Sequence, residues 1–349
     1  MSDIVLVTDA WHPQINGVVR TLETTIAELR LLDIETAVVS PQGFKTVPMP
    51  TYPEIRLAVT RPSTVAVAIE RAKPRYLHIA TEGPLGYMAR KWCLANSFPF
   101  TTSYHTRFPE YVKARAPVPL SWSYRWVRRF HNGGVGCMVS NATLERELGE
   151  RGFTNLYRWT RGVDAELFNP DEPPALDLPR PVFMYVGRVS VEKNIEAFLS
   201  LDLPGSKVVV GDGPAFADLK ARYRDVVFTG AKSGRELTAC YTSADAFVFP
   251  SKTDTWGLVL MEALACGVPV AAYPIMGPRD VIGTDGPGVL DDDLGAAALA
   301  ALDIDRGRCR EYALGYSWEA SARQFLDNIT AANDAAVERA RAARAARAA

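Results

Sequence analysis

Short apolar runs alternate with helical segments along this chain, and the alternation limits the folds open to it. The first run, Ile4–Val7, is rich in β-branched residues and leads through a glycine-containing loop to Val18–Leu32, where apolar residues recur at helical spacing. A continuous apolar run of this length is typical of a parallel strand that is buried on both faces. Because the same order recurs along most of the chain, the sequence predicts an α/β fold with parallel sheets.

The alternation is interrupted at Asn169–Pro181, which contains five prolines, and it restarts at Val182–Val186. A chain of 349 residues is long for one domain and comfortable for two. We therefore predict an N-terminal domain over residues 1–168, a C-terminal domain over 169–315, and a last helix over 316–349 whose Ala- and Arg-rich end frays. The proline-rich segment is the predicted linker.

Charge and cysteine content narrow the class of protein. The net charge is −1, so no overall basic field indicates a nucleic-acid partner. Residues 1–170 carry a net charge of +5 and the remainder −6, which favours an acidic partner or an anionic membrane surface for the first half, with chance unevenness as the alternative. The five cysteines form no C-x-x-C pair. With no signal peptide and no run of about 20 apolar residues, we expect a cytoplasmic protein with buried thiols and no membrane-spanning segment.

One strand–loop–helix unit, at residues 246–272, carries a pattern that suits phosphate. The apolar strand Ala246–Phe249 leads to a loop with Asp254, and Gly257 opens a helix that contains Glu262. The first N–H groups of a helix lack internal partners and carry partial positive charge, and a glycine lets this backbone approach a ligand closely. We predict a phosphate-binding site here, with an ordinary unit bearing surface acids as the alternative.

A second candidate site follows the apolar run Val182–Val186. Arg188 and Lys193 lie in the loop that runs into the predicted helix Ile195–Leu199. Two fixed cations at a strand-to-helix turn can stabilise the negative charge that grows on a departing diphosphate. A surface turn held by salt bridges is the alternative.

In the N-terminal half, candidate binding residues follow two predicted strands. His105 comes directly after Phe100–Tyr104, which places it at the carboxyl edge of a sheet, where open α/β folds bind ligands. Gly17 ends the loop after the first strand, and this loop lacks the G-x-G-x-x-G pattern of nicotinamide dinucleotide sites. His12 in the same loop could be catalytic, but we expect a packing role for it.

Taken together, four segments of the chain resemble the retaining glycosyltransferases of family 4, which have the GT-B fold. They are His-Pro-x-x-Asn-Gly-Val-x-Arg at 12–20, Ser-Tyr-His-Thr-x-Phe-Pro at 103–109, Gly-Arg-x-Ser-x-Glu-Lys-Asn at 187–194, and the acid-x7-acid pattern at 254–262. The first acid of that pattern is usually Glu and is Asp254 here. The resemblance implies two Rossmann-like domains facing across a cleft, an acceptor-binding first domain, a donor-binding second domain, and a last helix that crosses back to the first.

The resemblance also implies a reaction, the transfer of a hexose or hexuronic acid from a UDP- or GDP-sugar. It implies these roles: Arg188 and Lys193 hold the diphosphate, Glu262 binds the ribose, Asp254 and the backbone of Gly257 and Leu258 face the donor sugar and phosphates, His105 contacts the sugar, and Gly17 closes the cleft. The departing phosphate takes the acceptor proton, so no side-chain nucleophile is needed. A sugar-nucleotide isomerase of the same fold, a transferase acting on a soluble or polysaccharide acceptor, and a silent binding module are the alternatives.

The segment Leu120–Asn132 bears on the acceptor. Trp122, Trp126 and Phe130 recur every four residues, and Arg125, Arg128 and Arg129 lie around them. A Trp-rich amphipathic helix flanked by arginines suits a membrane interface, whereas burial of the aromatic rings against the sheet is the alternative. With the family resemblance, the first interpretation favours a lipid acceptor such as diacylglycerol and a peripheral position on the inner face of the cell membrane.

A metal is not expected in this protein. No cluster of His, Cys or Asp has metal-ligand spacing. Asp291–Asp293 contains a D-x-D pattern, but it precedes the predicted helix Leu294–Leu302, whose N-terminus acidic residues would stabilise. We therefore expect a metal-independent enzyme without a cofactor beyond the donor substrate.

Overall fold

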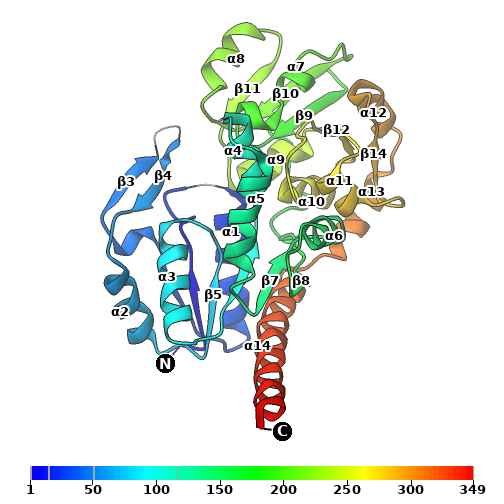
Figure 1. Ribbon diagram of the computed structural model, residues 1–349. Coiled ribbons are helices and arrows are strands. Elements are labelled where there is room, and N and C mark those ends of the chain that lie inside the picture. Colours follow the sequence, from blue (N-terminus) through cyan, green and yellow to red (C-terminus); the bar gives the residue numbers. More distant parts are fainter. Residues whose placement is uncertain (1, 15, 50–51, 116, 349) are drawn as a thin grey trace. The chain divides into compact units, whose positions relative to one another are not determined.

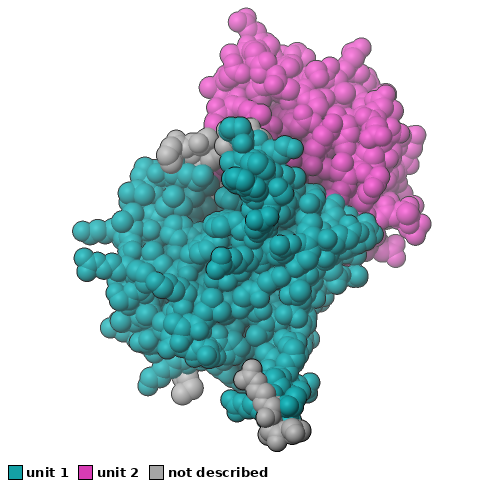
Figure 2. Space-filling view, viewed as in Figure 1, with its two compact units in different colours: residues 1–160, 318–349 teal, residues 161–317 magenta. Residues whose placement is uncertain are grey.

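The computed structural model describes residues 2–14, 16–49, 52–115 and 117–348. These form two compact units, coloured separately in Figure 2. Unit 1 comprises residues 1–160 and 318–349, and unit 2 comprises residues 161–317. The units therefore divide near the boundaries predicted at residues 168 and 315, but not at them.

Unit 1 is built on a six-stranded parallel sheet in the order β2-β1-β5-β6-β7-β8. Figure 1 labels β5, β7 and β8 of this sheet. The strands are β1 (Ile4–Val7), β2 (Thr36–Val39), β5 (Tyr76–Ile79), β6 (Thr101–Tyr104), β7 (Gly136–Val139) and β8 (Leu156–Arg158). The helices are α1 (Gly17–Leu31), α2 (Pro62–Ala72), α3 (Pro84–Ala95), α4 (Phe108–Arg115), α5 (Leu120–His131), α6 (Ala142–Glu150) and α14 (Trp318–Ala348). All four residues of β1, β6 and β7 are buried. The apolar sequences of β1 and β7 agree with this, whereas β6 buries the polar residues Thr101, Thr102 and Ser103.

The two faces of this sheet carry separate cores, because side chains along a strand alternate between faces. Val5 and Val7 join a cluster with residues of α2, α3 and α5. Ile4 and Leu6 join another with residues of α1 and α14, among them Phe325. The last helix of the chain therefore completes the core of unit 1, which confirms the predicted return to the first domain. The end that was expected to fray continues as helix to Ala348.

A two-stranded hairpin in unit 1 was not predicted. β3 (Thr46–Met49) and β4 (Tyr52–Ala58) pair antiparallel and lie outside the parallel sheet. Pro48 lies within β3 and Pro53 within β4, and proline normally argues against a strand because it has no N–H to donate. The strands tolerate these prolines because the hairpin has only two strands, so each strand is an edge.

Unit 2 repeats the plan with a parallel sheet in the order β11-β10-β9-β12-β13-β14. Its strands are β9 (Val182–Val186), β10 (Ser206–Val210), β11 (Val227–Gly230), β12 (Ala246–Phe249), β13 (Val270–Ala272) and β14 (Gly288–Leu290). Its helices are η2 (Val191–Lys193), α7 (Glu196–Leu199), α8 (Phe216–Arg222), α9 (Gly234–Thr242), α10 (Leu258–Ala265), α11 (Met276–Ile282), α12 (Leu294–Ala301) and α13 (Arg306–Leu314). Two cores cover its two faces.

The linker prediction for Asn169–Pro181 is wrong, because this segment packs within unit 2. The N–H of Ala175 donates to the carbonyl of Ala239 at 3.0 Å, and the N–H of Leu176 donates to Ser243 Oγ at 3.0 Å. Leu176 also packs against the larger core of the unit. The proline-rich segment is therefore an extended part of unit 2 that packs on its surface, not a flexible linker between domains.

All five cysteines are buried and unpaired, as expected from their apolar surroundings. Across the described part of the chain, none of the helices combines the length and the apolar character needed to cross a bilayer.

Candidate active site

The two segments predicted to bind phosphate meet at one place in unit 2. The strand order reverses between β9 and β12, and ligands of open α/β sheets bind outside the carboxyl ends of the strands at such a point. The loop after β9 contains Arg188 and Lys193. The loop after β12 contains Asp254 and ends at Gly257, directly before α10. Parallel strands therefore deliver both loops to one edge of the sheet.

Side chains and backbone tie these loops to each other. Lys193 Nζ lies 2.5 Å from Asp254 Oδ1, and both side chains are largely buried, with 22% and 17% of their surface exposed. Asn194 Nδ2 donates to the carbonyl of Pro250 at 3.0 Å. Asn194 adopts a left-handed conformation that separates η2 from α7. The helix predicted at Ile195–Leu199 is α7, and η2 is a short turn within the segment predicted as loop. The ion pair was not predicted, since sequence spacing cannot show which cation meets which acid.

Tyr185 holds the backbone of the first loop. Its buried hydroxyl donates to the carbonyl of Arg188 at 2.9 Å. Burial raises the pKa of Tyr185 well above its ordinary value, and the charges of Asp254 and Glu192 act in the same direction. The phenol therefore stays protonated and remains a donor. A Cβ at Gly187 would lie 2.8 Å from this hydroxyl, so the loop needs glycine there.

Three buried polar atoms on the two loops make no hydrogen bond within the part of the chain that the structure describes. They are Ser190 Oγ, Asp254 Oδ2 and Trp256 Nε1. Leaving such an atom without a partner costs about 1–3 kcal/mol, so clustered examples need an explanation. A polar ligand bound at these loops would supply one. Trp256 was not among the predicted site residues, because the sequence does not show that its Nε1 is buried without a partner.

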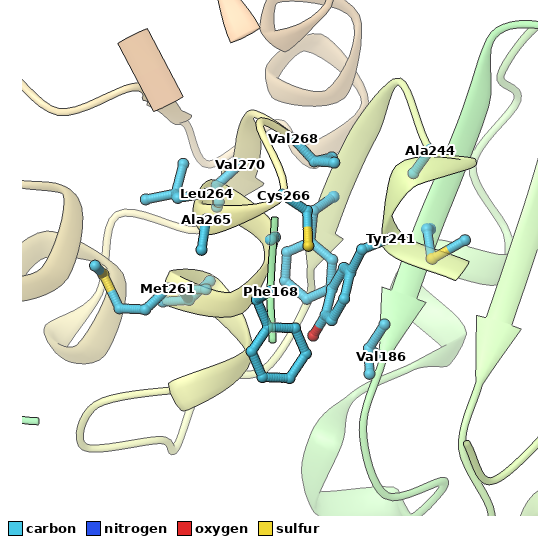
Figure 3. Packing of buried hydrophobic residues seen from close by; sticks show 14 of the residues in the cluster. Phe168, Val186, Tyr241, Ala244, Met261, Leu264, Ala265, Cys266, Val268 and Val270 are labelled. Atoms are coloured by element: carbon cyan, nitrogen blue, oxygen red, sulfur yellow. The ribbon is translucent and has the colours of Figure 1, made fainter. Parts of the chain in front are cut away.

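The N-terminus of α10 has the form expected for anion binding. Gly257 precedes it with φ +91°, and no side chain caps the helix. The first N–H groups of the helix are therefore not satisfied by a side-chain cap, and they add to the positive charge of Lys193. Met261, Leu264 and Ala265 anchor α10 in the larger core of unit 2 (Figure 3). This packing fixes the direction in which the helix start points.

Glu262 lies in the second turn of α10 and is almost entirely buried, with 4% of its surface exposed. Its Oε2 accepts a hydrogen bond of 3.0 Å from the hydroxyl of Tyr241, a residue that the sequence did not single out. Tyr241 in turn packs edge-on against Phe168, with ring centroids 5.9 Å apart (Figure 3). The role of Glu262 at the ribose stays a prediction.

The aspartates at 291–293 act as a helix cap. Asp293 Oδ1 accepts hydrogen bonds of 3.0 Å from the N–H groups of Gly295 and Ala296 at the start of α12. This confirms the helix-cap interpretation of the D-x-D pattern. Within the described ranges, no group of three or more His, Cys, Asp or Glu side chains is placed to hold a metal ion.

In unit 1 the predicted residues lie at the carboxyl edge of the other sheet. His105 follows β6, and its ring packs edge-on against Trp159 at 5.7 Å. Gly17 begins α1, which is capped by Asn16. His12 is exposed and contacts Glu23, and its ring packs edge-on against Trp11 of the same loop, with ring centroids 5.8 Å apart. The donor-sugar contact of His105 and the function of Gly17 stay predictions.

The aromatic residues of α5 divide between core and surface. Phe130 is buried, with 1% of its surface exposed, whereas Trp122 is 66% and Trp126 is 44% exposed. The membrane-interface interpretation is therefore wrong for Phe130, and the burial alternative is wrong for Trp122. Trp126 stacks on Tyr87 of α3, with ring centroids 5.0 Å apart and planes inclined by 24°.

Comparison with known proteins identifies the family. The model of "Glycosyltransferase Family 4" matches residues 15–167, and that of "Glycosyl transferases group 1" matches residues 170–304. The chain is 27% identical to a GDP-mannose-dependent alpha-mannosyltransferase of Mycobacterium tuberculosis, covering 94% of this chain and 96% of that protein. It is 25% identical to the alpha-monoglucosyldiacylglycerol synthase of Streptococcus pneumoniae, covering 92% and 83%. It is 32% identical to sulfoquinovosyl transferase SQD2 of Arabidopsis thaliana over 70% of this chain, but spans only about half of that protein, 52%.

Solved structures agree on the fold. The sucrose-phosphate synthase of Thermosynechococcus elongatus superimposes with a TM-score of 0.73 at 19% identity, covering 94% of this chain and 98% of that one. Anabaena Alr3699/HepE in complex with UDP and glucose gives 0.68 at 14% identity, with coverage of 95% and 100%. The two family models together span most of the chain, and both sheets have the Rossmann-like plan. The chain therefore belongs to the glycosyltransferases of family 4 and has the GT-B fold.

Proposed function

We propose that this glycosyltransferase is a retaining enzyme that moves a hexose from a UDP- or GDP-sugar to a hydroxyl group of a membrane lipid such as diacylglycerol. One observation carries the donor assignment: the three unpartnered buried polar atoms of Ser190, Asp254 and Trp256 lie on the two loops that Lys193 joins, beside the uncapped start of α10. These groups together suit a sugar diphosphate, which is both anionic and rich in hydrogen-bonding atoms.

In this proposal the cations stabilise the departing nucleoside diphosphate. The bond between the anomeric carbon and the phosphate oxygen breaks, and the electron pair stays on the phosphate. Lys193, Arg188 and the first N–H groups of α10 stabilise the new charge. Lysine has three donors, so Lys193 can bind Asp254 and a phosphate oxygen together.

The acceptor oxygen then bonds to the anomeric carbon from the face that the phosphate leaves, and its proton passes to the departing phosphate oxygen. This sequence keeps the anomeric configuration without a side-chain nucleophile. The arrangement of Asp254 supports it, because a carboxylate engaged by Lys193 at 2.5 Å is a poor nucleophile. Asp254 Oδ2, the unpartnered atom, is suited to accept a hydrogen bond from a sugar hydroxyl.

The surface of α5 supports a lipid acceptor. Trp122 and Trp126 are exposed beside the exposed arginines Arg125 and Arg129. Exposed indole rings flanked by cations match the boundary between headgroups and acyl chains of an anionic bilayer. The adjoining surface of α3 is an open groove lined by Pro84, Tyr87, Met88, Arg90, Lys91 and Leu94. The name of the S. pneumoniae relative, alpha-monoglucosyldiacylglycerol synthase, favours the same class of acceptor.

The experiment is a transfer assay with labelled UDP-glucose and GDP-mannose in separate reactions. Vesicles of phosphatidylcholine and phosphatidylglycerol supply 1,2-dioleoylglycerol, and the product is extracted into organic solvent. We expect label in the lipid fraction from one donor and its loss in Lys193→Ala. Label that appears only in a soluble acceptor would favour the alternative of a soluble or polysaccharide acceptor. Conversion of the donor into another nucleotide sugar would favour the isomerase.

A further inference from the structure

We propose that Glu82, held in place by the buried imidazole of His131, binds an acceptor hydroxyl at the edge of the sheet of unit 1 and selects against an anionic group there. This inference deepens the proposed function and rests on it. It starts from the sheet order. In unit 1 the order reverses between β1 and β5, just as it reverses in unit 2 between β9 and β12, where the donor loops lie.

Two acidic residues follow the strands at this reversal, and they have different tasks. Asp9 follows β1 and is 7% exposed. Its carboxylate accepts from the N–H groups of Leu85 at 2.9 Å and Gly86 at 3.2 Å, and from Thr81 Oγ1 at 3.1 Å. Asp9 therefore holds the start of α3. Glu82 follows β5, and its side chain is 16% exposed, so it is the acid at this reversal that a ligand can reach.

The turn that carries Glu82 is tightly built. A Cβ at Gly83 would lie 2.3 Å from Asp9 Cγ, and a Cβ at Gly86 would lie 2.0 Å from the carbonyl oxygen of Thr81. Neither position has space for a side chain. The chain around Glu82 therefore packs closely against Asp9 and Thr81, which limits the positions open to its carboxylate.

His131 orients this carboxylate from the interior. Its side chain is fully buried at the end of α5, and Nε2 lies 3.0 Å from Glu82 Oε1. Its other nitrogen, Nδ1, lies 2.8 Å from Thr102 Oγ1, and the Thr102 hydroxyl donates to the carbonyl of Gly136 at 3.4 Å. With its proton on Gly136, that hydroxyl can accept from Nδ1–H, and Nε2–H can donate to Glu82. The contacts therefore accommodate an imidazole that is protonated on both nitrogens and is a cation.

The charge state of His131 agrees with this network. Burial of the ring works against its charge, but Cys137 and Glu82 together raise the pKa of His131 to about 10. Glu82 therefore faces a protonated His131 at neutral pH. Among the residues that the structure describes, His131 provides the one hydrogen bond to Glu82 that we find, and it occupies Oε1. Oε2 is then the atom that a ligand hydroxyl can use.

The chemistry of the pair defines the ligand. A carboxylate without its proton only accepts hydrogen bonds, so Oε2 of Glu82 binds a hydroxyl and offers no donor to a phosphate. Burying an ion pair contributes little to stability, whereas a fixed carboxylate at a ligand-binding edge gives selectivity. An acceptor such as glycerol or diacylglycerol fits this site, and one with a phosphate beside the reacting hydroxyl does not.

The test compares Glu82→Gln with Glu70→Gln, a matched control. Glu70 also accepts one side-chain hydrogen bond, from Trp92 Nε1 at 2.9 Å, but it lies on α2. The soluble probes are glycerol and glycerol 3-phosphate, assayed alongside dioleoylglycerol vesicles, with donor hydrolysis measured in the absence of an acceptor. For Glu82→Gln we expect the KM for glycerol and dioleoylglycerol to rise at least tenfold. We also expect a higher rate ratio of glycerol 3-phosphate to glycerol, and unchanged donor hydrolysis and UDP or GDP binding.

The outcomes distinguish the role of Glu82 from the proposed function. A Glu82→Gln enzyme with the acceptor KM and rate ratio of Glu70→Gln would overturn the inference. A wild-type enzyme that hydrolyses the donor but transfers its sugar to none of the three acceptors would also overturn the inference. A wild-type enzyme that consumes no nucleotide sugar would refute the proposed function itself. His131→Gln, which keeps a donor, should retain more acceptor affinity than His131→Leu at equal kcat, and melting curves of both variants show whether they fold.

Discussion

At the scale of single residues, the contact between Lys193 and Asp254 gives a direct test of the proposed donor site. We expect Lys193→Ala and Arg188→Ala each to lower kcat about 10²–10³-fold, because in the proposed mechanism each supplies a positive charge at the oxygen where negative charge develops. Steady-state kinetics with a saturating donor would measure this. Lys232→Ala is the control, since Lys232 forms an ion pair with Glu236 outside these loops. Turnover close to wild type in both Lys193→Ala and Arg188→Ala would show that these cations do not stabilise the departing diphosphate.

His131 should make the stability of the protein depend on pH. Its pKa is about 10 in the folded protein, against an ordinary value of 6.5. The stabilisation that the His131 charge provides is therefore complete below about pH 6.5 and is lost as pH rises through 10, because the folded state holds the extra proton in this window. Between pH 6.5 and 9.5, the free energy of unfolding measured with denaturant should fall more steeply for wild type than for Glu82→Gln. Equal slopes would contradict a charged His131.

Sequence reasoning reached the residues of the proposed donor site because their chemistry is local. Arg188 and Lys193 lie in one strand-to-helix connection, and Asp254 lies in the loop that leads to the start of α10. Glu82 and His131 could not be paired in this way, since 49 positions separate them and only the packing of α5 on the sheet brings them together. The unpartnered atoms of Ser190 and Trp256 were hidden for the same reason: a sequence shows which polar groups exist, but not which are buried.

At the scale of elements, α5 separates a surface role from a core role within one helix. Trp122→Ala should leave the melting temperature unchanged and weaken binding to anionic vesicles, because this ring is exposed. Phe130→Ala should cost about 3–5 kcal/mol of stability, because its ring is buried. Vesicle sedimentation and thermal melting of both variants would measure this. A large loss of stability in Trp122→Ala would contradict the exposed position.

The arginines of α5 need the same distinction. Arg128 Nη1 donates to the carbonyl of Arg151 at 2.7 Å, so its replacement would disturb the fold. Arg125 and Arg129 are exposed and can be replaced together by Ser. Each basic residue near an anionic surface contributes about 1 kcal/mol, so the double variant should bind such vesicles roughly 30-fold more weakly at low salt. Vesicle binding that ignores both salt and these replacements would exclude an electrostatic contribution.

Among the elements, periodicity predicted the buried parallel strands well and failed where proline misled it. Strands such as β1 and β12 are short apolar runs, and their burial on both faces explains why the sequence shows them clearly. Pro48 hid the β3–β4 hairpin, and the prolines of Asn169–Pro181 suggested a linker where the chain packs on unit 2. Proline limits the backbone angles, but it does not determine whether a segment is buried.

At the scale of the whole molecule, the proposed mechanism stabilises the charge on the leaving group with fixed side-chain cations and the start of a helix. We therefore expect EDTA to leave activity unchanged, and added magnesium or manganese to alter it less than twofold. Transfer assays with the metal-stripped protein would measure this. Activity that EDTA abolishes and manganese restores would show that the charge on the leaving group is stabilised by an ion instead.

Unit 1 is discontinuous in sequence, and this affects how the protein is made. On the ribosome, residues 1–160 emerge first, yet the apolar residues of α14 that cover Ile4, Leu6 and Trp159 emerge only after all of unit 2. During synthesis, the apolar face of unit 1 that α14 covers therefore stays exposed until α14 emerges. Residues 161–317 contain the complete sheet of unit 2 in one stretch, so this unit can fold as it emerges. In a chain that stops after Ser317, unit 2 should therefore fold, whereas unit 1 should aggregate through its exposed apolar face unless a chaperone binds it.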